Sequence, residues 1–253
     1  MKRILTAAVA IPIVVLLTIF APAWLFALAV GSVTAVAVEE LFSLAEKQGI
    51  GRPRRWFLVP VAAVSVSFLW GYGSVVSSMV IAAILLMIAA VFADSLQAGL
   101  GRVAIGLGSL VYCPLTLGFM ILMPRGRILL LFAIVWMGDT AAYYGGRAMG
   151  RHLLAPRVSP KKTVEGAISG LIGSIIVGVA GGTWFFHEPW PGLIWISMAT
   201  AIAGQAGDLA ESVLKRSAGV KDSSSLMPGH GGILDRLDSL FFAIPIFYWL
   251  FSA

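Results

Sequence analysis

Ionisable side chains are concentrated between Ser212 and Ser239, in a chain of 253 residues of which only 12% are charged. This stretch contains four Lys/Arg, three Asp and His230, which stands within the turn sequence Pro-Gly-His-Gly-Gly. Carboxylates are the hard oxygen ligands that Mg²⁺ prefers, and Lys and Arg bind phosphate. Glycines let backbone N–H groups approach an anion closely. The stretch therefore predicts a site for phosphates and a divalent cation.

A second set of polar residues precedes it within an apolar segment: Gln205, Asp208, Glu211 and Lys215. Steps of three, three and four residues place all four side chains on one face of a helix. In a membrane helix such a face must look into a cavity or the protein interior and not into lipid. The alternative to a ligand site is a buried ion pair of Asp208 or Glu211 with Lys215.

Asp235 and Asp238 follow, three residues apart, at the start of the last apolar run. Asp208 and Asp235 lie near the same end of two consecutive antiparallel helices, where their side chains can meet. Two neighbouring carboxylates repel each other unless a cation lies between them. This pair predicts a magnesium ion, with the remaining ligands supplied by water and phosphate.

Two upstream segments carry further candidates. Asp139 lies in a polar segment, 138–147, and Lys161, Lys162 and Glu165 lie in Ser159–Gly166. We expect Thr163 to cap the helix that follows it. The two lysines face an incoming anion or are ordinary cytoplasmic-loop charge, and the residues alone leave both interpretations open.

The elements that position these residues are membrane helices. The chain is 59% hydrophobic with a mean hydropathy of +0.93, whereas a soluble domain of this length carries about a quarter charged residues. We therefore expect an all-α, polytopic helical bundle without a separate soluble domain, because isolated strands cannot satisfy their backbone in lipid. Nine apolar runs predict about nine transmembrane helices, at 4–20, 23–38, 56–70, 75–93, 103–123, 128–144, 163–186, 193–214 and 232–252.

The basic residues predict the orientation. With the N-terminus in the cytoplasm, 16 of the 18 Lys and Arg fall in segments on the cytoplasmic side. Every dense polar segment then lies on that side. Because topology explains the net charge of +6, we expect no nucleic-acid partner. Gly166 and Gly170, and likewise Gly178 and Gly182, are spaced for close helix packing.

The motif from Ser212 to Asp238 resembles the signature of the phosphatidate cytidylyltransferases. It reads Ser-x-Leu-Lys-Arg, four residues, Lys-Asp, and then Pro-x-His-Gly-Gly-x-x-Asp-Arg-x-Asp. The polar segments around Asp139 and from Ser159 to Gly166 are also similar to that family. The resemblance covers residues 130–252, whereas the first hundred residues match only as generic apolar spans. Two positions depart from the usual pattern: Ser224 stands where Gly is common, and Met227 where Ile or Leu is common.

The resemblance implies transfer of CMP from CTP to phosphatidic acid, which yields CDP-diacylglycerol and pyrophosphate in phospholipid biosynthesis. It also implies a multi-pass protein of the cell (inner) membrane, with its N-terminus and active site facing the cytoplasm, and a homodimer. The catalytic helices are expected in residues 126–253, behind N-terminal membrane helices in residues 1–125.

The resemblance and the residues together suggest specific roles. The expected metal ligands, for Mg²⁺ in a two-cation site, are Asp208, Asp235, Asp238 and Glu211. The expected catalytic residues are Asp208, Asp235, Lys215, Arg236 and His230. The expected substrate-binding residues are Asp139, Lys161, Lys162, Glu165, Arg216, Lys221, Asp222, Gly231 and Gly232.

Two other classes of function compete with this interpretation. A CTP-dependent lipid kinase would transfer the γ-phosphate and release CDP. An ion-coupled secondary transporter also uses intramembrane carboxylates. Against a transporter, no inverted repeat is visible, and the charges gather at one side of the membrane.

Overall fold

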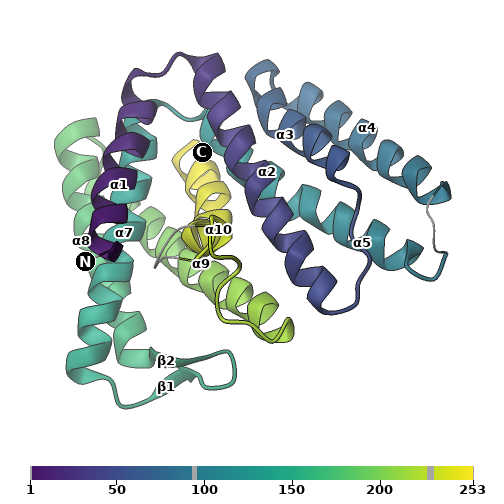
Figure 1. Ribbon diagram of the computed structural model, residues 1–253. Helices are drawn as coiled ribbons and strands as arrows, with labels where there is room; N and C mark the ends of the chain where they lie inside the picture. Colours follow the sequence, from purple (N-terminus) through teal and green to yellow (C-terminus); the bar gives the residue numbers. More distant parts are fainter. Residues whose placement is uncertain (1, 93–95, 227–230, 253) are drawn as a thin grey trace. The chain divides into compact units, whose positions relative to one another are not determined.

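The computed structural model describes residues 2–92, 96–226 and 231–252 (Figure 1). Over these residues the chain is helical apart from short connections and one β-hairpin. The helices are α1 (Lys2–Phe20), α2 (Ala23–Lys47), α3 (Leu58–Ser67), α4 (Tyr72–Val91), α5 (Gly99–Leu110), α6 (Thr116–Leu122), α7 (Arg125–Met149), α8 (Val164–Phe186), α9 (Trp190–Ser217) and α10 (Leu234–Ser252). Short helical turns flank α3, η1 (Arg55–Phe57) and η2 (Phe68–Trp70), and a π-turn, η3 (Val111–Leu115), joins α5 to α6.

Over the described residues, each of the nine predicted apolar runs corresponds to one helical segment, and the all-α fold class is confirmed. Among the described residues, six segments are long and apolar enough to cross a membrane: α2, α4, the continuous stretch Gly99–Leu122, α7, α8 and α9. Two shorter apolar helices, Ala8–Phe20 and Arg55–Trp70, account for two more runs. The last run is α10, whose first five residues include Asp235, Arg236 and Asp238. The protein is thus a multi-pass membrane protein, and nine is an approximate count of its spans.

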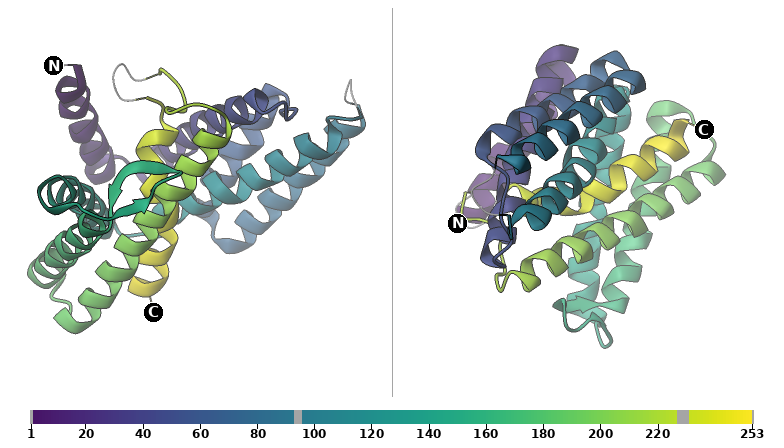
Figure 2. Two further views of the ribbon diagram at one scale, coloured as in Figure 1. Left: turned by 90° about the horizontal axis from the view of Figure 1, so that it is seen from below. Right: turned by 90° about the vertical axis from the view of Figure 1, so that its right-hand side faces the viewer.

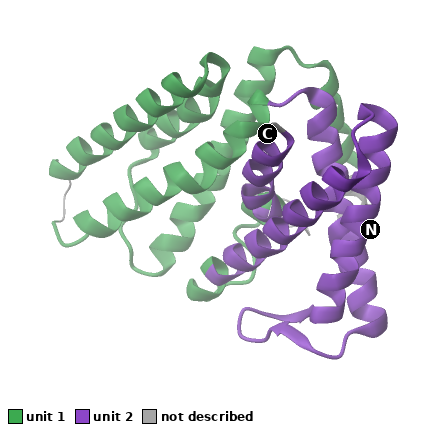
Figure 3. Ribbon diagram, turned by 180° about the vertical axis from the view of Figure 1, so that it is seen from behind, with its two compact units in different colours: residues 1–122, 214–237 green, residues 123–213, 238–253 purple. Residues whose placement is uncertain are grey.

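The chain forms two compact units that interleave along the sequence (Figure 3). Unit 1 consists of residues 1–122 and 214–237, and unit 2 of residues 123–213 and 238–253. Helices α9 and α10 each pass from one unit to the other. The first boundary lies close to the predicted division at residue 125. The assignment of catalysis to residues 126–253 stays a prediction.

In unit 1, α2 packs on α3 and α6, α3 packs on α4, and α4 packs on α5 (Figure 1). Aromatic rings fill this core: Phe42, Phe57 and Phe68 are buried, and the Phe68 and Phe119 rings meet edge to face with centroids 5.4 Å apart. The apolar face of α2 therefore packs against other helices of unit 1. This packing fixes the orientation of α2 and, with it, the positions of the polar residues near its C-terminal end.

In unit 2, small residues allow the helices to approach closely. A Cβ atom added to Gly170 of α8 would lie 2.8 Å from the carbonyl oxygen of Gly138 on α7. One added to Gly178 would overlap Ser197 of α9. One added to Gly207 of α9 would meet the backbone of α10 at 2.5 Å. The predicted packing role of the glycines in α8 is confirmed, and glycines of α7 and α9 extend it.

The hairpin pairs β1 (Leu153–Ala155) with β2 (Ser159–Thr163) in antiparallel register. It projects beyond the ends of α7 and α8 (Figure 2). The sequence did not predict a strand here, because the polar 159–163 stretch carries no alternating apolar pattern. Thr163 ends β2 and caps α8, accepting a hydrogen bond from Gly166 N through Oγ1 at 3.1 Å. The predicted cap is confirmed.

Candidate functional site

Asp235 lies in the first turn of α10, and its carboxylate organises the end of unit 1 that contains the signature motif. Oδ1 accepts a hydrogen bond from Lys215 Nζ of α9 at 2.6 Å. Oδ2 accepts hydrogen bonds from Ser223 N at 2.9 Å and from Gly232 N at 2.7 Å, and lies 2.8 Å from Ser223 Oγ. The Lys215 and Asp235 side chains are only 11% and 4% exposed. Asp235 therefore links α9, the 218–233 connection and α10.

Glu40, near the C-terminal end of α2, contacts the same connection at two places, within its first half and where it joins α10. Its Oε1 accepts hydrogen bonds from Ile233 N at 3.0 Å and Ser224 Oγ at 2.6 Å. Its Oε2 accepts from Leu234 N at 2.8 Å and lies 2.8 Å from Ser223 Oγ. The side chain is buried. Sequence reasoning missed this residue; the available signal was an acidic residue directly after an apolar run.

The two glycines of the turn fit tightly around these carboxylates. Gly231 has a φ of +80°, in the left-handed region that favours glycine. A Cβ atom on Gly232 would overlap the Glu40 carboxylate and the Ser223 hydroxyl. The glycines were expected to bring backbone N–H groups to an anion, and for Gly232 the anion in this structure is the Asp235 side chain. His230 lies outside the described residues.

In unit 2, the predicted polar face of α9 looks into the protein. Gln205 Nε2 donates a hydrogen bond to the carbonyl of Ala167 on α8 at 3.0 Å. Asp208 forms an ion pair with Lys162 of β2. Glu211, one turn further along, is fully buried. The expectation that this face avoids lipid is confirmed.

Three carboxylates lie within electrostatic reach of Asp238 in unit 2. Asp238, at the beginning of the unit 2 part of α10, interacts electrostatically with Asp208 and Glu211 of α9 and with Asp139 of α7. Asp139 also lines a small cavity with Gln205 and other residues of α7, α8, α9 and α10. We call Asp139, Asp208, Glu211 and Asp238 the carboxylate cluster.

The donor chemistry of this cluster fits a divalent cation. Like charges gathered inside a helical bundle need neutralisation, and carboxylate oxygens are the ligands that Mg²⁺ takes. Among residues 2–92, 96–226 and 231–252, no three His, Cys, Asp or Glu side chains lie in a metal-ligand arrangement. The negative charge of the cluster is therefore suited to a cation. To coordinate one, its carboxylates would have to move closer together. Asp235 belongs to unit 1, and its pairing with Asp208 stays a prediction.

The other predicted site residues divide between the units: Lys161 and Glu165 belong to unit 2, and Arg216, Lys221, Asp222 and Arg236 belong to unit 1. Glu165 accepts hydrogen bonds from the backbone N–H groups of Arg151 and His152 at 3.0 and 3.2 Å, and its Oε1 lies 2.6 Å from His152 Nδ1. It therefore fixes the base of the hairpin. Arg216 donates to the carbonyl of Val220 at 3.2 Å. The remaining candidates are exposed: Lys161 on β2, Lys221 and Asp222 after α9, and Arg236 on α10.

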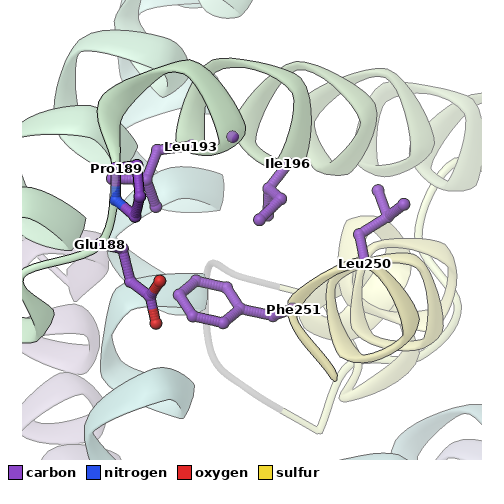
Figure 4. Close-up of a pocket in the computed structure, with 7 residues that line it drawn as sticks. Glu188, Pro189, Leu193, Ile196, Leu250 and Phe251 are labelled. Carbon is purple, nitrogen blue, oxygen red and sulfur yellow. The ribbon is translucent and has the colours of Figure 1, made fainter. Parts of the chain in front are cut away.

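A separate apolar pocket of about 190 Å³ opens in unit 2, where the first turns of α9 meet the end of α10 (Figure 4). Pro189, Leu193, Ile196, Leu250 and Phe251 line it together with Glu188. Leu193 precedes Asp208 by fifteen residues, which is about 22 Å along a helix. The pocket therefore lies far from the carboxylate cluster.

Comparison with known proteins identifies the family. A phosphatidate cytidylyltransferase of Haemophilus influenzae is 45% identical over 129 residues, which are 49% of this chain and 45% of the relative. The enzymes of that name from Staphylococcus haemolyticus and Staphylococcus saprophyticus are 49% and 50% identical over 123 and 121 residues, 47% of this chain and 46% of each relative. The chain spans about half the length of the curated relatives it matches. The model of the cytidylyltransferase family matches the chain from residue 1 to residue 253, and the protein therefore belongs to that family.

Proposed function

We propose that this protein is a CTP:phosphatidate cytidylyltransferase, which transfers CMP from CTP to phosphatidic acid and releases pyrophosphate. The observation that carries the proposal is the carboxylate cluster of unit 2, with Lys162 paired to Asp208, in a chain of the cytidylyltransferase family. The name of the relatives, phosphatidate cytidylyltransferase, indicates phosphatidic acid as the lipid and a cytidine nucleotide as the donor.

The reaction asks for positioning and charge neutralisation more than for proton transfer. A phosphate oxygen of the lipid attacks the α-phosphorus of CTP and forms the new P–O bond. The bond from that phosphorus to the oxygen bridging to the β-phosphate breaks, and pyrophosphate leaves with the bonding electrons. Because the attacking oxygen is already anionic near neutral pH, no strong general base is needed. Holding two anions in line supplies the larger part of catalysis.

The carboxylate cluster would hold magnesium. When bound, Mg²⁺ neutralises charge on the phosphates and orients them for in-line transfer. Asp208, Glu211 and Asp238 would be its ligands, with Asp139 as a further candidate, since Asp238 interacts electrostatically with the other three. The two-cation arrangement and the participation of Asp235 stay predictions.

Basic side chains would bind the phosphates. Lys162 forms an ion pair with Asp208. If a cation were bound by the carboxylates, Lys162 could bind a phosphate oxygen in place of Asp208. Lys161, Lys221 and Arg236 are exposed and would contact phosphate oxygens of a bound ligand. Arg236 and Arg216 offer a planar fork, and the lysines offer point charges.

The distribution of basic residues supports an active site on the cytoplasmic side, and we assign the protein to the cell (inner) membrane as a proposal. We also infer a homodimer, on the family resemblance alone.

The test is incubation of the purified full chain in lipid nanodiscs with CTP, phosphatidic acid and Mg²⁺, with products identified by mass spectrometry. We expect CDP-diacylglycerol and pyrophosphate in equal amounts. CDP together with a newly phosphorylated lipid would instead identify a lipid kinase. Absence of any CDP-lipid from folded protein would refute the proposal.

Asp208→Asn tests the role of the cluster. We expect a folded protein that has lost at least about 100-fold in turnover, because the amide removes a ligand charge. Glu188→Gln is a matched control at the opposite end of α9, beside the apolar pocket, and should remain active. An active Asp208→Asn protein with unchanged magnesium dependence would contradict the assigned metal role.

A further inference from the structure

Glu40 is a buried carboxylate in the N-terminal half of the chain, a region that the sequence motifs do not reach. It is 5% exposed and lies on α2, whereas all four of its hydrogen-bond donors belong to the signature motif or directly adjoin it. Its contacts therefore bring together parts of the chain that are more than 180 residues apart.

Each oxygen of Glu40 receives one backbone donor and one hydroxyl donor. Oε1 takes Ile233 N and Ser224 Oγ, and Oε2 takes Leu234 N and Ser223 Oγ. Four donors are the number that an ionised carboxylate accepts. The two backbone donors are N–H groups at the start of α10, where the helix dipole favours a negative charge. Glu40 thus caps α10 from another helix.

The same carboxylate holds two parts of the chain between α9 and α10. Ser223 and Ser224 lie in the first half of the 218–233 connection, and Ile233 and Leu234 lie where the connection joins α10. Ser223 Oγ also lies 2.8 Å from Asp235 Oδ2, so its single proton bridges two carboxylates. Residues of the motif that are expected to bind phosphate lie between or beside these anchor points.

We propose that Glu40 is a positioning residue, which holds Ser223, Ser224, Ile233 and Leu234, at the two ends of the 223–234 segment, so that the polar groups of the motif beside them are presented to the substrates. That substrates bind near this segment rests on the proposed function. That Glu40 holds the segment rests on the four hydrogen bonds described above. Ser224, which stands where Gly is common in the family, adds one of the four hydrogen bonds in this chain.

Glu40→Gln tests whether the Glu40 hydrogen bonds hold the 223–234 segment, with almost no change in side-chain volume. A glutamine offers one oxygen and one NH₂ group. Either serine hydroxyl can turn and accept a hydrogen bond from NH₂, but a backbone N–H cannot. In either orientation of the amide, Ile233 N or Leu234 N therefore faces a donor and loses its partner. Glu39→Gln is the matched control: Glu39 is adjacent on α2, and its Oε1 contacts Arg52 and Arg55, outside the 223–234 segment.

The first readout is hydrogen–deuterium exchange and needs no activity. Loss of a hydrogen bond to a charged group is expected to speed exchange of the 223–234 amides roughly 10- to 100-fold in Glu40→Gln. Peptides from α7 and α8 should exchange as in the wild type, and Glu39→Gln should leave the 223–234 amides unchanged. Unchanged exchange in Glu40→Gln, or faster exchange throughout both units, would overturn the proposal.

The second readout is steady-state kinetics. A misplaced segment should raise KM for CTP and lower kcat/KM roughly 10- to 100-fold, as outer partners of a site commonly do. A smaller folded fraction would lower the apparent kcat and leave KM unchanged, and that result would also overturn a positioning role. If the wild-type protein formed no CDP-lipid, the proposed function would fall, and the exchange measurement would still decide whether Glu40 holds the segment.

Discussion

Replacing Lys215 with methionine should destabilise unit 1, because it leaves the Asp235 carboxylate as an uncompensated buried charge. The Lys215 Nζ–Asp235 Oδ1 distance is 2.6 Å, and the two side chains are 11% and 4% exposed. Methionine keeps the length and most of the apolar contacts of the lysine side chain. The substitution therefore removes the charge with little loss of packing.

The magnitude follows from the geometry. At 2.6 Å and an effective dielectric constant of about 20, the attraction is about 6 kcal/mol. Desolvation of both groups offsets part of this, and breaking a buried pair typically costs about 3–5 kcal/mol. The donors from Ser223 and Gly232 stay on Asp235 Oδ2, which places the expected loss near the lower end. For a chain of this size, a loss of about 3 kcal/mol corresponds to a fall in Tm of roughly 6–12 °C.

The assay is thermal unfolding of the purified protein in nanodiscs, followed by tryptophan fluorescence. Lys221→Met removes an exposed lysine six residues away and should change Tm by no more than about 2 °C. The double variant Lys215→Met/Asp235→Asn should recover part of the loss, because it also removes the uncompensated charge of Asp235. A Lys215→Met protein with the wild-type Tm would refute the argument that this ion pair is buried and compensating.

Two further predictions concern local features. Thr163→Ala removes the acceptor for Gly166 N at the start of α8 and should cost about 1 kcal/mol of stability, whereas Thr163→Ser should retain it; equal Tm values for the two variants would contradict the capping role. Gly232→Ala places a methyl group into the Glu40 carboxylate and should speed amide exchange of the 223–234 segment, whereas Gly192→Ala, with open space around its Cβ position, should not; identical exchange in both alanine variants would show that the close approach at Gly232 is unimportant.

Local physics explains which parts of the fold the sequence predicts. A membrane helix must be long and apolar, so nine apolar runs locate nine helical segments without knowledge of their partners. Helical periodicity alone places Gln205, Asp208 and Glu211 on one face, and the structure directs that face into the protein. The cap at Thr163 and the small residues of α8 are equally local signals.

The partners of the charged groups are not a local property. The sequence leaves a buried ion pair of Asp208 or Glu211 with Lys215 as an alternative to a ligand site, whereas the structure pairs Lys215 with Asp235 and Asp208 with Lys162. Spacing along a helix says which side chains share a face, but any nearby opposite charge can complete a pair. Only the packing of α9 against its neighbours selects among them.

What the sequence by itself determined is a multi-span helical protein with a polar face on α9 and a phosphate-type motif after it, since composition and periodicity carry that information. Only the tertiary structure decided that Glu40 of α2 belongs to the motif. A contact 183 residues distant in the chain leaves no periodic trace, and an acidic residue after an apolar run looks like the end of a span. In the folded protein, α2 places Glu40 where it accepts hydrogen bonds from the N–H groups at the start of α10.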